Sequence, residues 1–418
     1  MEFEVLKKSH VKRNIVIGVV AVLIISAIIL NFTSAKYRAT DSVPIIHSEI
    51  NYTPYDFKVM AMYQEDDTGE YTEIEEMPSS GYTINEEKSY CTTDNVNKDE
   101  NAKLYTLSTG EHVFSGLKKS SKCYLYFDKK TLLAADTILT GKDIQTRTDF
   151  SIPVTDTTTG VMYQTTDWKG TSYYFAGNPT DNWIYFEGYY WRIVRINGDG
   201  SVRLIYNGTS TTTTGKETLT NISKEFNDRY SWTIYVGLKY TSGEQHGQNT
   251  DSPILNTLQS WYSSSGLSYS QYLDTNIGFC SDRNVVSGES WDKSDSHNYA
   301  AYGRLVSSKE PSLDCNNSGD IIKEPVGLIT ADELAYAGGV YEKNNTSYYL
   351  YNNQAYWTMT PYYCDFMYYA YVFNVNSNGQ LVFDMVNSAY GVRPVINLKA
   401  DTKFTGEGTV NSPFEVAS

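Results

Sequence analysis

The feature that constrains the fold most is a stretch near the C-terminus, residues 355–399, which reads AYWTMTPYYCDFMYYAYVFNVNSNGQLVFDMVNSAYGVRPVINLK. Its segments 369–375, 381–386 and 391–398 are rich in aromatic and β-branched residues, which is typical of strands. The sequence NSNG at 376–379 joins the first two segments, and Asn and Gly tolerate the positive φ that hairpin turns require. We therefore expect three strands of an antiparallel sheet in this stretch.

A tyrosine-rich loop is expected at 357–369, ahead of these strands. Pro361, Cys364 and Asp365 fall in this segment, and such residues are unusual inside a strand. Rigid strands that hold an aromatic loop form a binding platform more readily than a catalytic one. We take the residues that these elements would bring together as the candidate ligand-binding set: Trp357, Met359, Tyr362, Tyr363, Asp365, Tyr368, Asn387 and Tyr390. The alternative is that Trp357 and Met359 belong to the core and that the tyrosines cover the edge of the sheet.

Near the N-terminus lies an apolar run, IVIGVVAVLIISAIIL at 15–30, which carries no charged residue. At about 1.5 Å per residue, a helix over 14–32 approaches the roughly 30 Å thickness of the hydrocarbon core of a bilayer. Basic residues in 1–13 precede the run and few follow it, which predicts a cytoplasmic tail, a single helix in contact with membrane lipid and an extracellular remainder. A cleaved signal peptide is the alternative, with the small residues TSA at 33–35 as its cleavage site, although the run exceeds the usual apolar length.

The formal net charge of −15 argues against a nucleic-acid partner, because phosphate binding needs clustered Lys and Arg. The charge suits an extracellular domain that must remain soluble. The sequence contains no GxGxxG, P-loop or HExxH motif, and its five histidines are scattered without metal-ligand spacing. We therefore assign no catalytic residue, no metal and no cofactor.

Residues 51–130 are expected to form a small all-β domain, a sandwich of the immunoglobulin-like type. Short alternating runs are separated there by Gly, Pro, Asn and Asp. These runs are 55–63, 71–75, 112–117 and 122–127. A tether, 33–50, would precede this domain. A polar connector, 131–166, with a short helix at 132–139, would follow it.

The five cysteines predict two disulfides inside the extracellular domains. Pairing Cys91 with Cys123 and Cys280 with Cys315 is the economical arrangement, because each bridge then stays within one domain. Each bridge would close a loop of roughly 30–35 residues, which corresponds to about 3–4 kcal/mol. Other pairings of five cysteines are open as well. Cys364 is left over, either as a buried inert residue or as a reactive thiol.

A larger α+β domain is expected over 167–418. The strands 189–196 and 201–206 flank the sequence NGDG, which is a strong hairpin signal. Ser252 before Pro253 predicts one helix start, and the capping-box sequence TADE at 330–333 predicts another.

Four segments of this domain resemble a widespread bacterial extracellular domain of unknown function. They are YYWRIVRINGDGSVRLIYNG (189–208), GLITADELAYAGG (327–339), YWTMTP (356–361) and GVRPVINL (391–398). That domain is related to the C-type-lectin-like fold of formylglycine-generating enzymes and of receptor-binding proteins diversified by retroelements. The resemblance implies two helices, a small twisted antiparallel sheet and long irregular loops. In relatives of this fold the C-terminal loop region is the ligand-contacting face.

The sequence departs from the two chemistries that this fold is known to host. Sugar-binding C-type lectins hold calcium through Glu-Pro-Asn and a downstream Trp-Asn-Asp, whereas this chain has Val326 after Glu324 and Pro325 and no Trp-Asn-Asp. Formylglycine-generating enzymes hold copper through two neighbouring cysteines, whereas Cys364 stands alone in the C-terminal part. The resemblance therefore carries over a fold and not a reaction.

Some other positions have both a structural and a functional interpretation. Residues 282–284 are typical of a loop, with a cation site as the alternative. Arg393 is expected to pair with a buried carboxylate or to bind backbone carbonyls.

Taken together, these patterns predict a single-pass, membrane-anchored extracellular binding or adhesion protein. A small β domain would act as a spacer, and the C-type-lectin-like domain would recognise an extracellular protein or glycan through the aromatic loop. An envelope enzyme of the formylglycine-generating-enzyme-like fold is the alternative from another class, and a structural envelope subunit is a third hypothesis.

Overall fold

The computed structural model describes residues 58–417, except for 67–68, 79–81, 94–95, 108–111, 130–131, 294, 316, 366 and 368. The predicted cytoplasmic tail, membrane helix and tether, and residue Tyr368, lie outside the described residues. Within the described ranges, no helix is long and apolar enough to cross a membrane.

The chain divides into two compact units, Met1–Lys130 and Thr131–Ser418. Both are rich in strands, and the fold is of the mixed α+β kind. The two units are described separately below.

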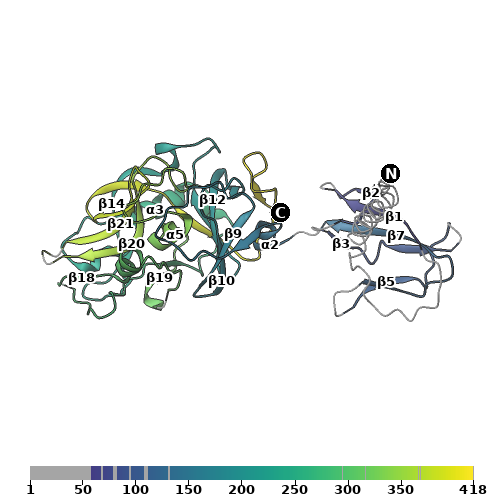
Figure 1. The fold of residues 1–418 in the computed structure, drawn as a ribbon, viewed down its shortest axis with the longest axis horizontal. Coiled ribbons are helices and arrows are strands. Elements are labelled where there is room, and N and C mark those ends of the chain that lie inside the picture. Colours follow the sequence, from purple (N-terminus) through teal and green to yellow (C-terminus); the bar gives the residue numbers. More distant parts are fainter. Residues whose placement is uncertain are drawn as a thin grey trace, which may run out of the picture. The chain divides into compact units, whose positions relative to one another are not determined.

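The first unit is built on one sheet and one separate hairpin (Figure 1). Its strands are β1 (Lys58–Glu65), β2 (Tyr71–Ile74), β3 (Tyr82–Ile84), β4 (Tyr90–Thr92), β5 (Lys103–Thr106), β6 (His112–Ser115) and β7 (Lys122–Lys129). The sheet has the order β2-β1-β7-β3, with β4 also paired to β7, and β1 runs parallel to β7. Strands β5 and β6 form the hairpin.

Strand β7 contributes Cys123, Leu125 and Phe127 to the core of this unit, because its residues alternate between buried and half-buried. Leu125 and Phe127 pack against Ile84 of β3 and Leu104 of β5, so the hairpin covers the sheet. Cys123 lies opposite Cys91 on the neighbouring strand, and the two sulfurs are 2.02 Å apart.

The second unit contains two larger sheets. The first, of nine strands, has the order β25-β26-β11-β12-β10-β9-β8, and β13 joins β12 to β24. Its strands are β8 (Asp143–Gln145), β9 (Val161–Asp167), β10 (Gly170–Tyr174), β11 (Trp183–Phe186), β12 (Tyr189–Ile196), β13 (Val202–Tyr206), β24 (Val395–Leu398), β25 (Phe404–Thr405) and β26 (Phe414–Val416). The β12–β13 hairpin is the one predicted from the NGDG turn, and it is antiparallel.

The second sheet, of six strands, has the order β14-β23-β20-β21-β22, with β18 paired to β20. Its strands are β14 (Asn221–Glu225), β18 (His297–Asn298), β20 (Tyr356–Cys364), β21 (Ala370–Val375), β22 (Leu381–Met385) and β23 (Ala389–Val392). Strands β21 and β22 form the hairpin that the NSNG sequence predicts, and Gly379 in its turn has a φ of 73°.

Short elements complete this unit between the sheets and helices. They are β15 (Lys239–Tyr240), β16 (Thr250–Asp251), β17 (Phe279–Cys280), β19 (Ile321–Ile322), a helical turn α4 (Ala300–Tyr302), the π-helical turn η4 (Gly303–Ser308), and the 3-10 turns η1 (Gly215–Thr218), η2 (Thr233–Val236), η3 (Leu267–Tyr269) and η5 (Ser318–Asp320). The second disulfide, between Cys280 and Cys315, has its sulfurs 2.09 Å apart and ties part of the long segment between α3 and α5.

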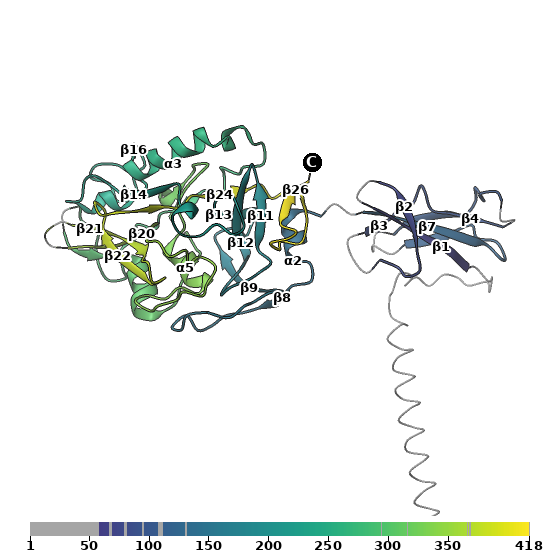
Figure 2. The same ribbon diagram turned by 90° about the horizontal axis from the view of Figure 1, so that it is seen from above.

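Both longer helices of this unit begin where the sequence predicts. Helix α3 (Pro253–Ser264) starts after Ser252, whose hydroxyl accepts a hydrogen bond from the amide of Leu255. Helix α5 (Ala331–Ala337) starts with a capping box in which Thr330 and Glu333 each accept from the other's backbone amide. Helix α5 lies between the two sheets in both views (Figure 1, Figure 2). All its residues are buried, and one hydrophobic core joins it to both sheets.

The segment 131–166 differs from the expected connector. It contributes α2 (Ala134–Leu139), β8 and β9 to the second unit, and β9 pairs with both β8 and β10. Met162 of β9 is fully buried, while Gln164 and Thr166 of the same strand are exposed. An edge region of this kind has few apolar residues, so its sequence resembles a linker although its backbone is paired.

The segment 357–369 is largely a strand and not the loop that was predicted. Strand β20 continues through Pro361 to Cys364, and it pairs with β21 and β18. The register shifts on both sides of Pro361, between Trp357 and Pro361 and between Pro361 and Tyr363. Proline has no amide hydrogen, so a bulge, where the ladder is already interrupted, accommodates it.

Candidate functional site

The structure places the first two predicted site residues in the core. Trp357 and Met359 are both fully buried on β20. The indole Nε1 of Trp357 donates to the carbonyl oxygen of Lys224 at 2.8 Å, and its ring contacts Phe226 and Tyr390 edge-on. These two side chains hold the sheet together, as the alternative interpretation of the sequence proposed.

The next two predicted residues belong to a group of packed rings that we call the aromatic face: Tyr341, Tyr362, Tyr363, Tyr371 and Phe383. Tyr362 stacks on Phe383 with 3.8 Å between ring centroids, and Tyr341 lies parallel to Tyr362 at 6.3 Å. Tyr371 links Tyr363 to Phe383 at 6.1 and 5.8 Å. The group therefore spans the three strands β20, β21 and β22.

The bulge in β20 explains how two consecutive residues join one group. Successive side chains of a regular strand point to opposite faces. The register shift between Pro361 and Tyr363 breaks this alternation, and the rings of Tyr362 and Tyr363 lie 6.4 Å apart. Bulges commonly re-aim side chains in this way.

Exposure divides the aromatic face into a support and a surface. Tyr362 is 7% exposed and lies beneath, whereas Phe383 is 36% exposed. Tyr341, Tyr363 and Tyr371 are half-buried. Each exposed ring thus packs on another ring, which fixes its orientation.

The carboxylate of Asp365 orients one phenol of this face, that of Tyr371. Asp365 accepts from the hydroxyl of Tyr371 at 3.1 Å and from the amides of Met367 and Tyr369 at 2.9 and 3.0 Å. Burial, together with the hydrogen bond to Asp365, raises the pKa of Tyr371 to about 12. The hydroxyl of Tyr371 is therefore a donor with a fixed direction at neutral pH.

The remaining predicted residues are spread around this region. Tyr390 is half-buried beside Trp357, and its hydroxyl donates to Asp384. Burial, together with that hydrogen bond, raises the pKa of Tyr390 to about 12. Asn387 is half-buried, and its Oδ1 has no hydrogen-bond partner among the described residues.

Some aromatic residues of this region, two of them in the aromatic face itself, were not identified from the sequence. Tyr371 and Phe383 were overlooked, although the alternation of aromatic residues in 369–375 indicated that Tyr371 would share a side with Tyr369. Tyr230 and Trp232, each 40% exposed, come from a distant loop. Tyr230 stacks on Tyr369 at 5.5 Å. No local sequence pattern predicts that contact, because Tyr230 and Tyr369 are distant in the sequence.

Cys364 is buried and unpaired. Burial, followed by the nearby charges of Asp365 and Asp295, raises the pKa of its thiol to about 12. A thiol with such a pKa holds its proton at neutral pH and is a poor nucleophile. The structure thus favours the inert alternative for this residue.

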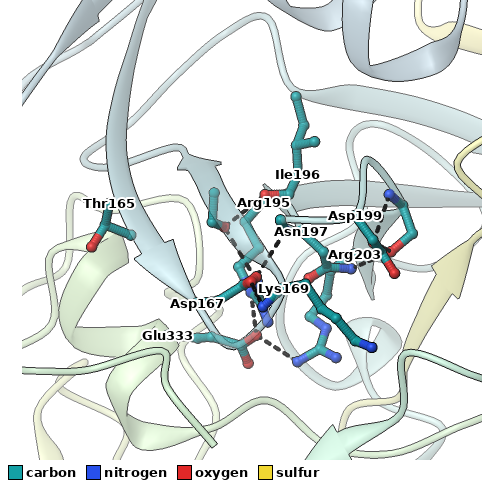
Figure 3. Close-up of polar contacts among 12 residues, drawn as sticks. Thr165, Asp167, Lys169, Arg195, Ile196, Asn197, Asp199, Arg203 and Glu333 are labelled. Carbon is teal, nitrogen blue, oxygen red and sulfur yellow. Dashed lines mark hydrogen bonds and ion pairs between the residues drawn. The ribbon is translucent and has the colours of Figure 1, made fainter.

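A second polar cluster, which we call the buried charge network, lies where α5 meets β12 and β13 (Figure 3). Glu333 accepts from Arg195 at 3.0 Å and from Arg203 at 2.7 Å, and Arg195 also contacts Asp167 at 2.6 Å. All four side chains are at most 2% exposed. The space beside them is about 20 Å³, which is room for one water and not for a substrate.

The loop 282–284 is held by ion pairs in the same part of the unit. Asp282 pairs with Arg304 at 2.5 Å, and Arg283 pairs with Asp320 at 3.1 Å. No group of three or more metal-ligating side chains occurs among the residues that the structure describes.

Of the two expectations for Arg393, the binding of backbone carbonyls is the one that the structure shows. Its Nε and Nη1 donate to the carbonyl oxygens of Tyr206 and Leu350, both at 2.8 Å, and its Nη2 donates to Oδ1 of Asn207 at 2.9 Å. It therefore joins β13 and β24 to the loop that precedes β20.

A comparison of the chain with family models, curated proteins and solved structures finds no match. The chemistry of the site is therefore inferred from its own geometry.

Proposed function

We propose that this chain is a membrane-anchored binding protein whose second unit recognises an extracellular protein or glycan through the aromatic face. The observation that carries this proposal is the set of half-exposed rings on three paired strands. Rings that pack on one another lose little further conformational freedom when a ligand binds, so ordering them costs little of the binding free energy. Tyrosine also adds a polar end that can donate to a ligand oxygen.

The contact residues that we propose differ in part from the set predicted from the sequence. Tyr363, Tyr371 and Phe383 present the surface, while Tyr362 supports Phe383 from beneath. Asp365 accepts the proton of the Tyr371 hydroxyl, so the oxygen of this hydroxyl is left to accept a hydrogen bond from a ligand donor. Met367, whose amide donates to the same Asp365, adds an exposed, flexible apolar side chain to this loop.

The C-type-lectin-like fold is part of the same proposal. The two longer helices, the antiparallel pairing of β20, β21 and β22, and long irregular loops support it. Display on a membrane through the apolar run 15–30 would raise the effective concentration of such a head near its target.

An array of extracellular proteins and glycans, probed with the full-length chain in mild detergent, tests this proposal. We expect the wild-type protein to capture a ligand and the double variant Tyr363→Ala, Phe383→Ala to lose capture by at least about tenfold, as is usual when central aromatic contacts are removed. Tyr269→Ala is the matched control, because Tyr269 is 90% exposed and lies on η3, apart from the aromatic face.

Folding of the double variant is checked by circular dichroism and by its melting temperature. Tyr363→Phe, which keeps the ring, serves as the milder variant if the double variant is destabilised. Undiminished capture by folded double variant would contradict the aromatic face as the binding surface. Equal loss in the Tyr269→Ala control would do the same.

A further inference from the structure

A cleft at another place in the second unit, which shares no residue with the aromatic face, has the features of a binding site. It lies between the β11–β12 hairpin and the loops 207–218 and 346–352. Its volume is about 260 Å³, which is many times the roughly 15 Å³ that one water needs and close to the lower end, about 300 Å³, of small-molecule sites. The cleft therefore has room for a ligand of the size of one sugar ring.

Arg192 lies in the wall of this cleft without a carboxylate partner. Its side chain belongs to a residue that is 7% exposed. Nε donates to Oδ1 of Asn182 and Nη2 to the carbonyl oxygen of Pro179, both at 2.7 Å, while Nη1 has no partner among the described residues. Burial lowers the pKa of Arg192 to about 9, which still leaves it charged at neutral pH. A buried cation in neutral surroundings is costly unless an anion approaches it.

The other buried arginines show how unusual this arrangement is. Arg195, Arg203 and Arg283 each form an ion pair with a buried carboxylate. Arg393 is bound to carbonyl and amide oxygens, and its positive charge acts on Arg192. One acid, Asp181, acts on Arg192, and it is itself paired with Lys142. Arg192 thus forms no ion pair with a carboxylate among the described residues.

Aromatic rings hold the guanidinium in place. Its central carbon lies 4.2 Å from the ring centroid of Trp183, the residue opposite Arg192 on β11, and 5.2 Å from that of Tyr349. Two cation–π contacts and two hydrogen bonds restrict the guanidinium, whose planar fork matches a carboxylate. The group is therefore oriented before any ligand arrives.

Tyr349 provides a second donor without a partner. It is 4% exposed and lines the cleft, and its hydroxyl has no hydrogen-bond partner among the described residues. An unsatisfied buried hydroxyl costs free energy that a ligand oxygen can recover. The ring of Tyr349 lies 5.2 Å from the guanidinium carbon of Arg192, and both residues line the same cleft.

The rest of the lining is suited to hydroxyl groups and to a small apolar face. Thr211, Thr214, Thr346 and Ser347 contribute hydroxyls, and the ring of Tyr351 contributes an apolar surface. A lone inorganic anion would use few of these groups, whereas a sugar ring offers several hydroxyls and one apolar face to them. We propose that this cleft binds a carboxylate-bearing sugar, with Arg192 and Tyr349 contacting the carboxylate and the threonine-rich loop contacting the hydroxyls.

Titration calorimetry of the full-length chain with glucuronate tests the proposal. Glucose is the neutral counterpart and inorganic phosphate is the simple anion. We expect glucuronate to bind at least about tenfold more tightly than either probe, because charge-assisted hydrogen bonds and sugar contacts would both be needed. Trp183 in the cleft wall should report the same binding through tryptophan fluorescence.

Two conservative variants test the two proposed contacts with the carboxylate one at a time. Arg192→Gln should weaken glucuronate binding by about 10- to 100-fold, and Tyr349→Phe, which removes one oxygen atom, by about 3- to 10-fold. The double variant of the aromatic face, Tyr363→Ala with Phe383→Ala, should bind glucuronate as the wild-type protein does.

Several outcomes would overturn the proposal. They are failure of the folded wild-type protein to bind glucuronate, equal binding of glucose, equal binding of phosphate, and unchanged binding in both Arg192→Gln and Tyr349→Phe. Equal binding of phosphate would show a simple anion site and no sugar specificity.

Discussion

Arg192 and Arg195 stand three residues apart on β12, and their surroundings differ in one decisive respect. Arg195 contacts the carboxylates of Asp167 and Glu333 in the buried charge network. Arg192 has neutral hydrogen-bond partners and two aromatic rings. Burial alone does not distinguish the two positions, since both are at most 7% exposed.

The difference teaches how structural and ligand-binding charges can be separated in a chain of this kind. A buried charge that is matched inside the protein stabilises one arrangement of the backbone, and its loss leaves an unmatched partner. A buried charge that is not matched contributes little to folding but is ready for an external anion. Substitution of Arg195 should therefore lower stability strongly. Substitution of Arg192 should lower stability less and weaken ligand binding.

The largest effect is expected for Glu333→Gln. This substitution leaves Arg203 without a carboxylate and Arg195 with Asp167 only, so we expect a loss of about 3–5 kcal/mol in the free energy of unfolding. Urea denaturation measures it, with the exposed Glu407→Gln as the control that should change by less than about 0.5 kcal/mol. A loss below about 1 kcal/mol for Glu333→Gln would contradict the claim that the matched charges of the buried charge network stabilise the fold.

Acid should reproduce part of this effect in the wild-type protein. Burial opposes ionisation of Glu333, but the guanidinium groups of Arg203 and Arg195 outweigh it and lower its pKa to about 2 from an ordinary value of 4.5. The carboxylate thus contributes stability that is complete above about pH 5 and is lost as the pH falls towards 2, on the order of 3 kcal/mol. Urea titrations across this range should show the loss, and Glu333→Gln should flatten it. A parallel pH dependence in the variant would assign the effect to other groups.

A smaller loss of stability is expected for Arg192→Gln. The substitution removes hydrogen bonds to Asn182 and Pro179 but leaves no buried carboxylate behind, so about 1–2 kcal/mol is expected. Arg195→Gln, measured beside it, should cost at least about 2 kcal/mol more because it leaves the buried Asp167 without a guanidinium and Glu333 with Arg203 only. Equal losses for the two variants would mean that Arg192 has a structural partner of its own.

The smallest change in stability is expected for Tyr349→Phe. Its hydroxyl has no described partner, so its removal should leave the free energy of unfolding within about 0.5 kcal/mol or raise it slightly. Thermal denaturation measures this change. Tyr356→Phe is the contrasting variant, because its hydroxyl donates to the carbonyl oxygen of Leu350 at 2.9 Å and its loss should cost about 1 kcal/mol. A larger loss at Tyr349 than at Tyr356 would show that the hydroxyl of Tyr349 is used inside the protein.

Local patterns predicted much of the secondary structure of the second unit. The NGDG and NSNG sequences located the hairpins β12–β13 and β21–β22, and the residues Ser252 and Thr330 located the starts of α3 and α5. Such signals act within a few residues, so one sequence contains them in full. The strand through Pro361 was missed, because the bulge that tolerates proline depends on the neighbouring strand.

The sites were less accessible to sequence reasoning than the fold. The region of Tyr362 and Tyr363 was located, but which rings lie at the surface depends on how β20, β21 and β22 pair. Arg192 was not identified from the sequence, because it differs from Arg195 in having only neutral hydrogen-bond partners. The groups around it come from Asn182, Pro179 and Tyr349, and the last is far away in the sequence.

The most direct test of the contrast between matched and unmatched arginines is the melting temperature of the full-length wild-type protein and of Arg192→Gln, each with and without millimolar glucuronate. A ligand that binds the folded state raises its melting temperature. We expect glucuronate to raise the melting temperature of the wild-type protein, and the variant to melt a few degrees below the unliganded wild-type protein and to show no rise with glucuronate. A rise of equal size in both proteins, or none in the wild-type protein, would contradict the assignment of Arg192 to a ligand.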